Sequence, residues 1–356
     1  MILNNYKDIL VDQNISLMEA VKKMNKTSKQ ILLVLDSNNR LSGIITDGDI
    51  RRALINKLSF NESVKRIMNT NPITLKKIPS KAEALTLMKK YDVRHFPIID
   101  DQNRLKSLVL WKDFIESGDI SLNRKKNKVV IMAGGKGTRL DPFTKILPKP
   151  LIPIGENPII EHIMKNFSKY GFNDFVISLN YKADMIKLYF SENYNNFKID
   201  YTIEKKILGT AGSLSLCKDI LKDTFIVSNC DVLINANFNN LFDFHIDNSN
   251  HATILGTFQI VKIPYGILKT NNEILEDIIE KPEFNYLINS GIYVLDPVLI
   301  KLIPDNKEFS MPDLLIKAKK NGYKVKVFPM LCSWFDIGQW EEYRKAIDYL
   351  NTVKSI

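Results

Sequence analysis

The sequence predicts an α/β protein of two parts. Residues 1–120 contain an internal repeat in which a helical pattern leads into two short apolar strands, and residues 128–356 alternate apolar strands with amphipathic helices. Between them lies a polar and basic stretch, residues 121–127, which is typical of an exposed linker. The alternation in the second part favours a mostly parallel, mixed sheet with helices on both faces.

The internal repeat keeps one offset of 64 residues, the separation of Glu19 from Glu83. Seven identities carry it: Glu19 and Glu83, Ala20 and Ala84, Met24 and Met88, Asp36 and Asp100, Arg40 and Arg104, Leu41 and Leu105, and Asp49 and Asp113. The first copy holds the strands "ILLVLD" (31–36) and "LSGIIT" (41–46), and the second repeats them in "FPIIDDQNRLKSLVL" (96–110). Copies of about 60 residues, residues 8–60 and 67–118, are marginal as separate folds, so we expect them to pack on one another.

This repeat resembles a tandem pair of CBS domains. The resemblance implies β-α-β-β-α modules that bind an adenine nucleotide between them, or that pack two chains together as a homo-oligomer. In "GIITDGDIRRAL" (43–54) it assigns Thr46 and Asp49 to phosphate and ribose, whereas the second copy has Leu110 in place of the threonine and keeps Asp113. Both aspartates open predicted helices, where a capping carboxylate stabilises by about 1 kcal/mol without any ligand. A purely structural role therefore stays open.

The composition excludes several classes of protein. Hydrophobic residues make up 45% and charged residues 25%, as in ordinary globular proteins. No run approaches the roughly 18 apolar residues of a membrane span, and the first residues do not read as a signal peptide. Three isolated cysteines have no paired spacing for zinc or disulfides and suit a reducing cytoplasm, and four scattered histidines form no metal-ligand pattern. The net charge of +10 is dispersed, which disfavours a nucleic-acid partner and suits polyanionic small molecules.

The second part places a glycine-rich stretch where a sheet of this kind binds ligands. Its apolar strands and intervening helices are "KVVIM" (128–132), a helix near 157–170, "DFVISL" (174–179), a helix near 182–191, and "TFIVSN" (224–229). Ligands of open α/β sheets bind at the carboxyl ends of the strands. The stretch "IMAGGKGTRL" (131–140) begins at such an end.

Two familiar phosphate loops do not fit the glycine-rich stretch. A P-loop requires Gly-Lys followed by Ser or Thr, but Lys136 is followed by Gly137. A dinucleotide-binding loop requires a third glycine where Leu140 stands. What remains is a tight loop whose backbone amides surround a phosphate chain, because glycines allow close approach.

Together, "MAGGKGTRL" (132–140) and "LPKPLIPI" (147–154) resemble the sugar-1-phosphate nucleotidyltransferase family, the nucleoside-diphosphate-sugar pyrophosphorylases. The resemblance covers about residues 128–350 and implies a Rossmann-like sheet. Further matches follow in the family's order: "LGTAG" (208–212), "SNCD" (228–231), "YG" (265–266), "EKP" (280–282), "NSGIYVL" (289–295) and "WFDIG" (334–338). Each segment alone reads as an ordinary turn, cap or buried strand, and their ordered occurrence favours the enzyme.

The implied reaction explains the residue types. An oxygen of a sugar 1-phosphate attacks the α-phosphorus of a nucleoside triphosphate, and this oxygen is already ionised at neutral pH because the second phosphate pKa is about 6. No general base is needed, and the obstacle is repulsion between two polyanions. Mg²⁺ takes one or two carboxylates besides substrate phosphates, and the resemblance places Asp231 and Asp336 at those positions.

The resemblance also assigns the remaining roles residue by residue. Two cations would be catalytic, with Arg139 on the departing pyrophosphate and Lys149 on the reacting phosphates. The other nucleotide contacts would be Ala133, Gly134, Gly135, Gly137 and Thr138 for the phosphates and ribose, and Gly209, Thr210, Ala211 and Gly212 for the base. The sugar phosphate would be held by Gly266, Glu280, Lys281 and Asn289.

More specific resemblances indicate which nucleotide base and which sugar 1-phosphate the enzyme would use. "LGTAG" with "WFDIGQ" (334–339) resembles the guanylyltransferase branch and implies GTP, with UTP, dTTP and CTP as alternatives. The order of repeat and transferase resembles the glucosamine-1-phosphate guanylyltransferases of legionaminic acid biosynthesis, which implies GDP-glucosamine as product. Mannose 1-phosphate is an alternative acceptor. Phosphocholine would need an aromatic or acidic box that the sequence does not reveal, and a non-catalytic nucleotide sensor would not need both acidic and both basic positions.

Overall fold

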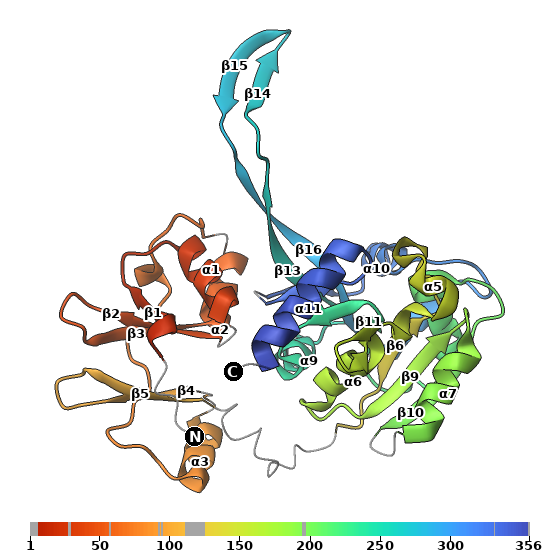
Figure 1. Ribbon diagram of the computed structural model, residues 1–356, viewed down its shortest axis with the longest axis horizontal. Helices are drawn as coiled ribbons and strands as arrows, with labels where there is room; N and C mark the ends of the chain where they lie inside the picture. Colours follow the sequence, from red (N-terminus) through yellow and green to blue (C-terminus); the bar gives the residue numbers. More distant parts are fainter. Residues whose placement is uncertain are drawn as a thin grey trace. The chain divides into compact units, whose positions relative to one another are not determined.

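The computed structural model describes residues 6–27, 30–56, 58–91, 93, 95–110, 125–193, 197–330 and 332–354. The chain divides into two compact units, the second of which starts at Leu122. Figure 1 shows both as ribbons, and each is described by itself.

The first unit contains the two copies of the repeat. Its elements are β1 (Leu10–Asp12), α1 (Leu17–Thr27), β2 (Ile31–Leu35), β3 (Leu41–Thr46), α2 (Asp47–Ile55), α3 (Lys81–Tyr91), β4 (His95–Ile99) and β5 (Leu105–Leu110). The first copy thus has the order β-α-β-β-α. β2 lies between a parallel β1 and an antiparallel β3, and β4 pairs antiparallel with β5. The copies contact each other where the Leu41 amide donates to the Asn103 carbonyl at 2.9 Å.

Both copies cap their first helix in the same way. The Glu19 carboxylate accepts from the Ser16 amide at 2.8 Å, and the Glu83 carboxylate accepts from the Ser80 amide at 2.8 Å. These hydrogen bonds lower the pKa of both glutamates. The Ser16–Glu19 and Ser80–Glu83 pairs are separated by the same offset as the sequence repeat. The identity of Glu19 and Glu83 is therefore explained by a capping box that both copies share.

The second unit is built on a seven-stranded sheet of order β10-β9-β6-β11-β16-β13-β17. Its strands are β6 (Val129–Ala133), β9 (Asp174–Leu179), β10 (Lys198–Ile203), β11 (Phe225–Asn229), β13 (Ala252–Lys262), β16 (Glu283–Leu295) and β17 (Val325–Met330). The first four strands of this order are mutually parallel, β16 is antiparallel to both neighbours, and β17 is parallel to β13. The predicted mixed, mostly parallel sheet is therefore confirmed.

Helices and short strand pairs complete the second unit. The helices are α5 (Phe143–Ile146), α6 (Ile159–Ser168), α7 (Ala183–Asn193), α8 (Gly209–Gly212), α9 (Phe238–Asp247), α10 (Met311–Lys320) and α11 (Trp340–Lys354). The short pairs join β7 (Pro153–Ile154) to β8 (Asn157–Pro158), β12 (Val232–Ile234) to β18 (Trp334–Asp336), and β14 (Ile267–Asn271) to β15 (Ile274–Ile279). α6 is amphipathic, since Ile159, Ile163 and Phe167 share its buried face.

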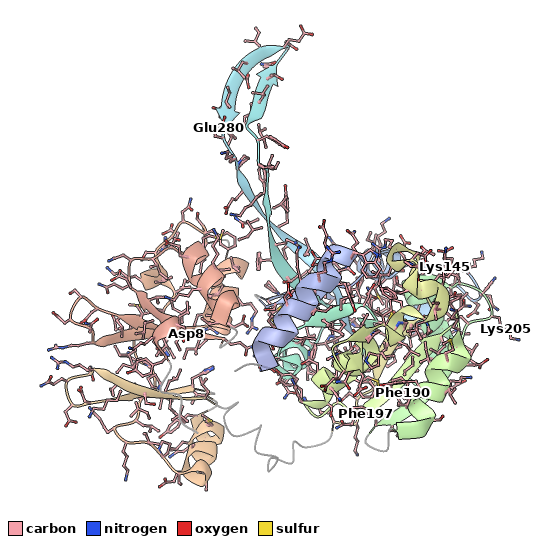
Figure 2. All side chains as sticks on the ribbon, viewed as in Figure 1. Asp8, Lys145, Phe190, Phe197, Lys205 and Glu280 are labelled. Carbon is pink, nitrogen blue, oxygen red and sulfur yellow. The ribbon has the colours of Figure 1, made fainter. Side chains whose placement is uncertain are left out.

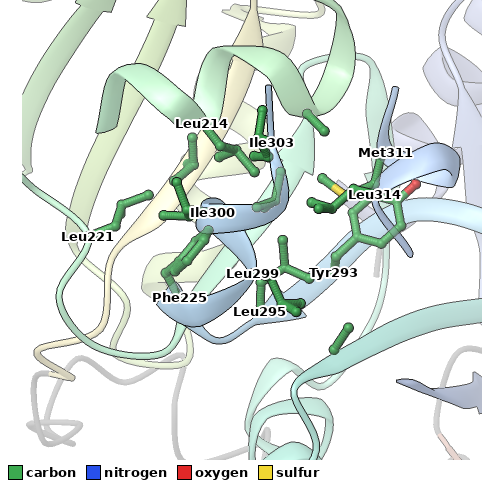
Figure 3. Packing of buried hydrophobic residues seen from close by; sticks show 14 of the residues in the cluster. Leu214, Leu221, Phe225, Tyr293, Leu295, Leu299, Ile300, Ile303, Met311 and Leu314 are labelled. Carbon is green, nitrogen blue, oxygen red and sulfur yellow. The ribbon is translucent and has the colours of Figure 1, made fainter. Parts of the chain in front are cut away.

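One core cluster lies between the sheet and α10. Figure 3 shows Leu299 and Ile300 close to Phe225 and Leu295, with Leu314 of α10 nearby. All five side chains are at most 4% exposed. Because their apolar surface leaves water on folding, this cluster fixes the sheet whose strand ends carry the site.

An arm extends from the sheet. β13 and β16 pair from Ala252–Leu295 out to Lys262–Glu283, whereas β11 joins β16 only as far as Ile292. Beyond that point the two-stranded ribbon continues into the β14–β15 hairpin and projects from the unit (Figure 1). Its turn is formed by Asn272 and Glu273, both left-handed, as a two-residue hairpin requires. We call residues 262–283 the arm; the sequence pattern did not reveal it.

The core cluster predicts unequal effects of two substitutions on α10. Leu314 is fully buried and Ile316 is 55% exposed. Leu314→Ala is expected to cost about 2–5 kcal/mol of unfolding free energy because it leaves a cavity, whereas Ile316→Ala should stay within about 0.5 kcal/mol. Urea unfolding followed by tryptophan fluorescence measures both. Equal costs would contradict this packing.

Candidate active site

A cavity of about 310 Å³ opens at the carboxyl ends of β6, β10 and β11. It is lined by the glycine-rich loop after β6, by Lys149, by the start of α8, and by the segment after β11. The lining residues are Met132, Gly134, Gly135, Gly137, Thr138, Arg139, Lys149, Glu204, Ile207, Gly209, Thr210, Ser213, Asn229, Cys230, Asp231 and Gly338. Parallel strands bring these distant segments to one edge.

The glycines of the loop serve two different purposes. A Cβ on Gly134 would lie 2.7 Å from Glu204 Oε1, and one on Gly137 would lie 2.8 Å from Lys149 Cβ. Gly137 is also left-handed, at φ +69°. A Cβ on Gly135, by contrast, would meet nothing within 4 Å. Packing therefore requires two of the glycines, and the third leaves the cavity wall open to an outside group.

Lys149 is held rigidly at the cavity. It lies between Pro148 and Pro150, its side chain is buried, and Nζ donates to Asp231 Oδ2 at 2.6 Å. A buried ammonium requires such a partner, because an unpaired charge away from water is costly. The pair places one fixed positive charge beside the loop amides.

A second carboxylate lies beside this ion pair. β12 pairs antiparallel with β18, so that Val232 lies opposite Asp336, and the Ile337 amide donates to the Asp231 carbonyl at 2.8 Å. Burial and the Asp231 charge raise the pKa of Asp336 above its usual value, while Lys149 and Arg139 act in the opposite direction. The carboxylates of Asp231 and Asp336, which are far apart in the sequence, thus lie near enough to repel each other.

The two carboxylates fit a divalent cation. Within the described parts of the chain no group of three or more His, Cys, Asp or Glu side chains could hold a metal on its own. Mg²⁺ commonly uses one or two carboxylates and completes its octahedron with water and substrate phosphates. A cation between Asp231 and Asp336 would also relieve the repulsion that raises the pKa of Asp336. Their role as metal ligands stays a prediction.

Arg139 lies close to Asp336. A Cβ on Gly338 would lie 3.0 Å from Arg139 Nη2 and 3.0 Å from Asp336 Oδ1. The glycine of "WFDIG" therefore lets the guanidinium and the carboxylate approach across one short turn. The cavity wall thus offers the cations Arg139 and Lys149 and the carboxylate of Asp231, and Asp336 lies beside Arg139 next to this wall.

The predicted base contacts divide between the cavity and the layer behind it. Gly209 and Thr210 line the cavity. The amides of Ala211 and Gly212 both donate to the Phe309 carbonyl at 3.0 Å, so they hold α8 against the chain. Ala133, predicted as a phosphate contact, is 1% exposed at the end of β6 and does not line the cavity.

The predicted sugar contacts are not gathered at the cavity. Gly266, Glu280 and Lys281 all belong to the arm, and none of them lines the cavity. Figure 2 shows Glu280 near the base of the arm, on the ribbon that projects from the sheet, and Lys205, next to the lining residue Glu204, on the body of the unit. Asn289 lies nearer the sheet, where its amide Nδ2 donates to the Tyr293 hydroxyl at 2.8 Å.

The predicted ligand residues of the first unit cap a helix. The Asp49 carboxylate accepts from the Thr46 amide at 2.8 Å and from its hydroxyl at 2.6 Å, and it pairs with Arg52. Thr46 and Asp49 form a complete capping box on α2, which supports the structural alternative. Asp113 lies outside the described residues.

Seven lining residues are not among the predicted site residues, and two of these seven, Glu204 and Cys230, carry titratable side chains. Glu204 is buried, follows β10, and accepts from the Ser178 hydroxyl and the Leu208 amide, each at 3.0 Å. Its position just after a strand was the one feature of the sequence that could have indicated a role at the ligand-binding edge of the sheet. Cys230 also lines the cavity, but burial raises the pKa of its thiol to about 12. It is therefore protonated at neutral pH and does not serve as a nucleophile.

Comparison with known proteins agrees with this arrangement. Residues 128–352 match the Nucleotidyl transferase family, and residues 5–56 and 64–118 match the CBS domain, which confirms the predicted pair. Mannose-1-phosphate guanyltransferases of Pichia angusta and Saccharomyces cerevisiae are 35% and 33% identical, over 61% and 64% of this chain. These matches span 62% and 65% of the relatives' own lengths, which is less than two thirds.

Solved structures show the same fold. HddC from Yersinia pseudotuberculosis superposes with a TM-score of 0.52 and 30% identity, covering 63% of this chain and 99% of that one. A structure of HddC complexed with GMP-PN gives a TM-score of 0.51 and 31% identity, with the same coverage. In the described part of this chain, no helix combines the length and apolar character needed to cross a bilayer.

The loop geometry predicts that replacing its glycines by alanine has different effects on the stability of the ligand-free protein. Gly137→Ala is expected to cost more than the roughly 1–2 kcal/mol of a left-handed backbone, because its methyl also meets Lys149. Gly135→Ala should stay within about 0.5 kcal/mol, since the space around it is open. Thermal unfolding compares the two. A loss of stability in Gly135→Ala as large as that in Gly137→Ala would contradict this loop structure.

The carboxylate pair predicts that Asp336→Asn raises the melting temperature when divalent ions are chelated. Because the pKa of Asp336 is raised in the folded protein, its ionisation opposes folding. This penalty is absent below the usual pKa of 3.8, develops as the pH rises from there towards the raised pKa, and is largest above the raised pKa. The gain should therefore shrink as the pH is lowered. A melting temperature unchanged or lowered at neutral pH would contradict the repulsion.

Proposed function

The chain belongs to the nucleotidyl transferase family, and from this premise we propose that it is an enzyme that transfers a nucleotidyl group from GTP to a sugar 1-phosphate. An oxygen of the sugar phosphate forms a bond to the α-phosphorus of GTP. The bond from that phosphorus to the oxygen bridging to the β-phosphate breaks, and pyrophosphate leaves with the electron pair. The observation that supports this proposal is the pair of Lys149 and Asp231 in the lining of the cavity at the open glycine loop, with Asp336 near enough to feel the charges of both.

The side chains of the cavity have distinct tasks in this reaction. The loop amides around Gly135 receive the triphosphate, and Arg139 binds the pyrophosphate that leaves. Lys149, held by Asp231, neutralises charge at the reacting phosphates without having to reorganise. Mg²⁺, held by Asp231 and Asp336, would supply further charge neutralisation and orient the triphosphate. No described side chain has to remove a proton, because the attacking phosphate is already ionised.

Guanine is the base best supported. The curated relatives are named mannose-1-phosphate guanyltransferases, and HddC has been crystallised with GMP-PN. For the acceptor, the order of CBS pair and transferase supports glucosamine 1-phosphate and a place in legionaminic acid biosynthesis. The relatives support mannose 1-phosphate equally well. We further propose that the reaction is cytoplasmic and that the CBS pair joins two chains or binds an adenine nucleotide.

One assay tests the proposal. Pyrophosphate release is measured with GTP, UTP, dTTP and CTP against glucosamine, mannose and other sugar 1-phosphates, with phosphocholine as a further acceptor. GTP with one of the two named sugars should give the highest kcat/KM, and activity should require Mg²⁺. Activity confined to phosphocholine, or to another nucleotide, would select an alternative instead. Repeating the assay with AMP, ADP and ATP tests regulation through the CBS pair.

Two substitutions at the cavity are expected to remove most of the activity. Lys149→Ala and Asp231→Asn should each cost about 3–4 kcal/mol of transition-state stabilisation, roughly two to three orders of magnitude in kcat/KM. Lys169→Ala is the matched control, because this exposed lysine follows α6 and does not line the cavity. Either variant retaining activity within threefold of wild type would refute its assigned role.

A further inference from the structure

The residues of the arm and the residues that line the cavity are separate sets. The lining of the cavity offers amides, cations and carboxylates for a triphosphate, but it contains no residue of the arm. On the arm, Glu280 lies directly beside Gly266, where a Cβ would be 3.0 Å from Oε1. The next residue, Lys281, is held in a left-handed conformation at φ +43°. A carboxylate suited to sugar hydroxyls and a lysine suited to a phosphate thus follow one another on the arm, outside the lining of the cavity.

The arm continues the sheet. Lys262 pairs with Glu283, the Ile263 amide donates to the Pro282 carbonyl at 3.1 Å, and pairing resumes at Ile267 with Ile279. Hydrogen bonds therefore join the strands on both sides of the short junction. β14 and β15 pair only with each other among the described strands. An isolated two-stranded hairpin is marginally stable in water, so this one requires a covering surface.

The surface of the arm is apolar and acidic. Five large apolar side chains, Tyr265, Leu268, Ile274, Leu275 and Ile278, are between 49% and 75% exposed. The arm also carries five acidic and three basic residues, a net charge of −2. Because the whole chain carries +10, the remainder carries +12. The arm is therefore complementary in charge to the rest of a second copy.

The rim of the cavity has the matching character. Ile207 lines the cavity and is 52% exposed. Between the lining residues Glu204 and Ile207 stand Lys205 and Lys206, both exposed. One segment of the rim is thus apolar and basic, and the lining contains none of the predicted sugar contacts. The arm contains about as many residues as one side of a standard interface, roughly 20–30.

We propose that the arm of one copy covers the cavity of a second copy and brings Glu280 and Lys281 to the sugar phosphate bound there. Two-fold symmetry makes the exchange mutual, so a pair of chains holds two complete sites and a single chain holds none. This inference rests on the proposed function for the identity of the acceptor. Lys281 binds the acceptor's phosphate, and Glu280 accepts hydrogen bonds from its hydroxyls.

Mixed dimers test the exchange. Chains carrying Asp231→Asn and Lys281→Ala, each with its own affinity tag, are co-expressed, and pairs containing one of each are isolated through both tags. Each variant alone should lose at least tenfold in kcat/KM. The mixed pair should recover about half of the wild-type activity, because one site combines an intact cavity with an intact arm. Absence of recovery, with wild type active and both variants folded, would overturn the inference and leave the proposed function standing.

A matched control excludes other sources of recovery. Asp231→Asn is paired with Lys149→Ala, two defects that both lie in the cavity. Each site of that pair is defective whichever chain supplies the arm, so its activity should stay as low as that of the variants alone. Recovery here equal to that of the first pair would show that chain mixing itself restores activity, and would overturn the inference.

Cross-linking gives a reading independent of activity. A photoreactive phenylalanine replaces Leu275 in the full-length protein, and isotope-labelled and unlabelled chains are mixed before irradiation. Cross-links between chains to peptides covering residues 134–149 or 203–212 are expected. Cross-links to these peptides only within one chain would show that the arm folds back on its own cavity, and none at all would show that it binds elsewhere. Either result overturns the inference, even if no transferase activity is found.

Discussion

The second unit depends on one electrostatic constraint, a buried ammonium paired with one carboxylate while a second carboxylate lies beside them. The contact of 2.6 Å between Lys149 and Asp231 satisfies the lysine. It leaves Asp336 with a raised pKa, in a position where its ionised form is unfavourable. Such a cluster does little for the stability of the empty protein. It is suited to a protein that binds a polyanion together with a cation, because the cation then neutralises the carboxylates while the ammonium neutralises part of the polyanion.

The fold supplies this cluster from separate segments. The parallel strands β6, β10 and β11 end at one edge and present the glycine loop, Glu204 and Asp231 there. The short β12–β18 pair then brings Asp336 back from near the end of the chain. Gly134, Gly137 and Gly338 allow the approaches that the cluster needs. The conformations of single glycines and the pairing of distant strands thus together bring these charged side chains close to one another.

Much of this arrangement could be predicted from sequence because it depends on local patterns. The strands over 31–36, 41–46 and 174–179 follow from apolar runs bounded by turns, and β9 has the predicted bounds. The gathering of the glycine loop and Lys149 follows from strand ends meeting at one edge. What escaped prediction depends on pairing between distant segments. The direction of the arm is set by the ladder between β13 and β16, and the amides of Ala211 and Gly212 are taken by the Phe309 carbonyl.

The central claim is that the two carboxylates act on the triphosphate as one unit, and a double-mutant cycle in kcat/KM tests it most directly. Asp231→Asn, Asp336→Asn and the double variant are compared at saturating Mg²⁺. If both side chains hold one ion, removing the second after the first should cost little, and all three variants should lose nearly the same factor. Losses that simply multiply in the double variant would mean that the two carboxylates act independently, and would contradict the account.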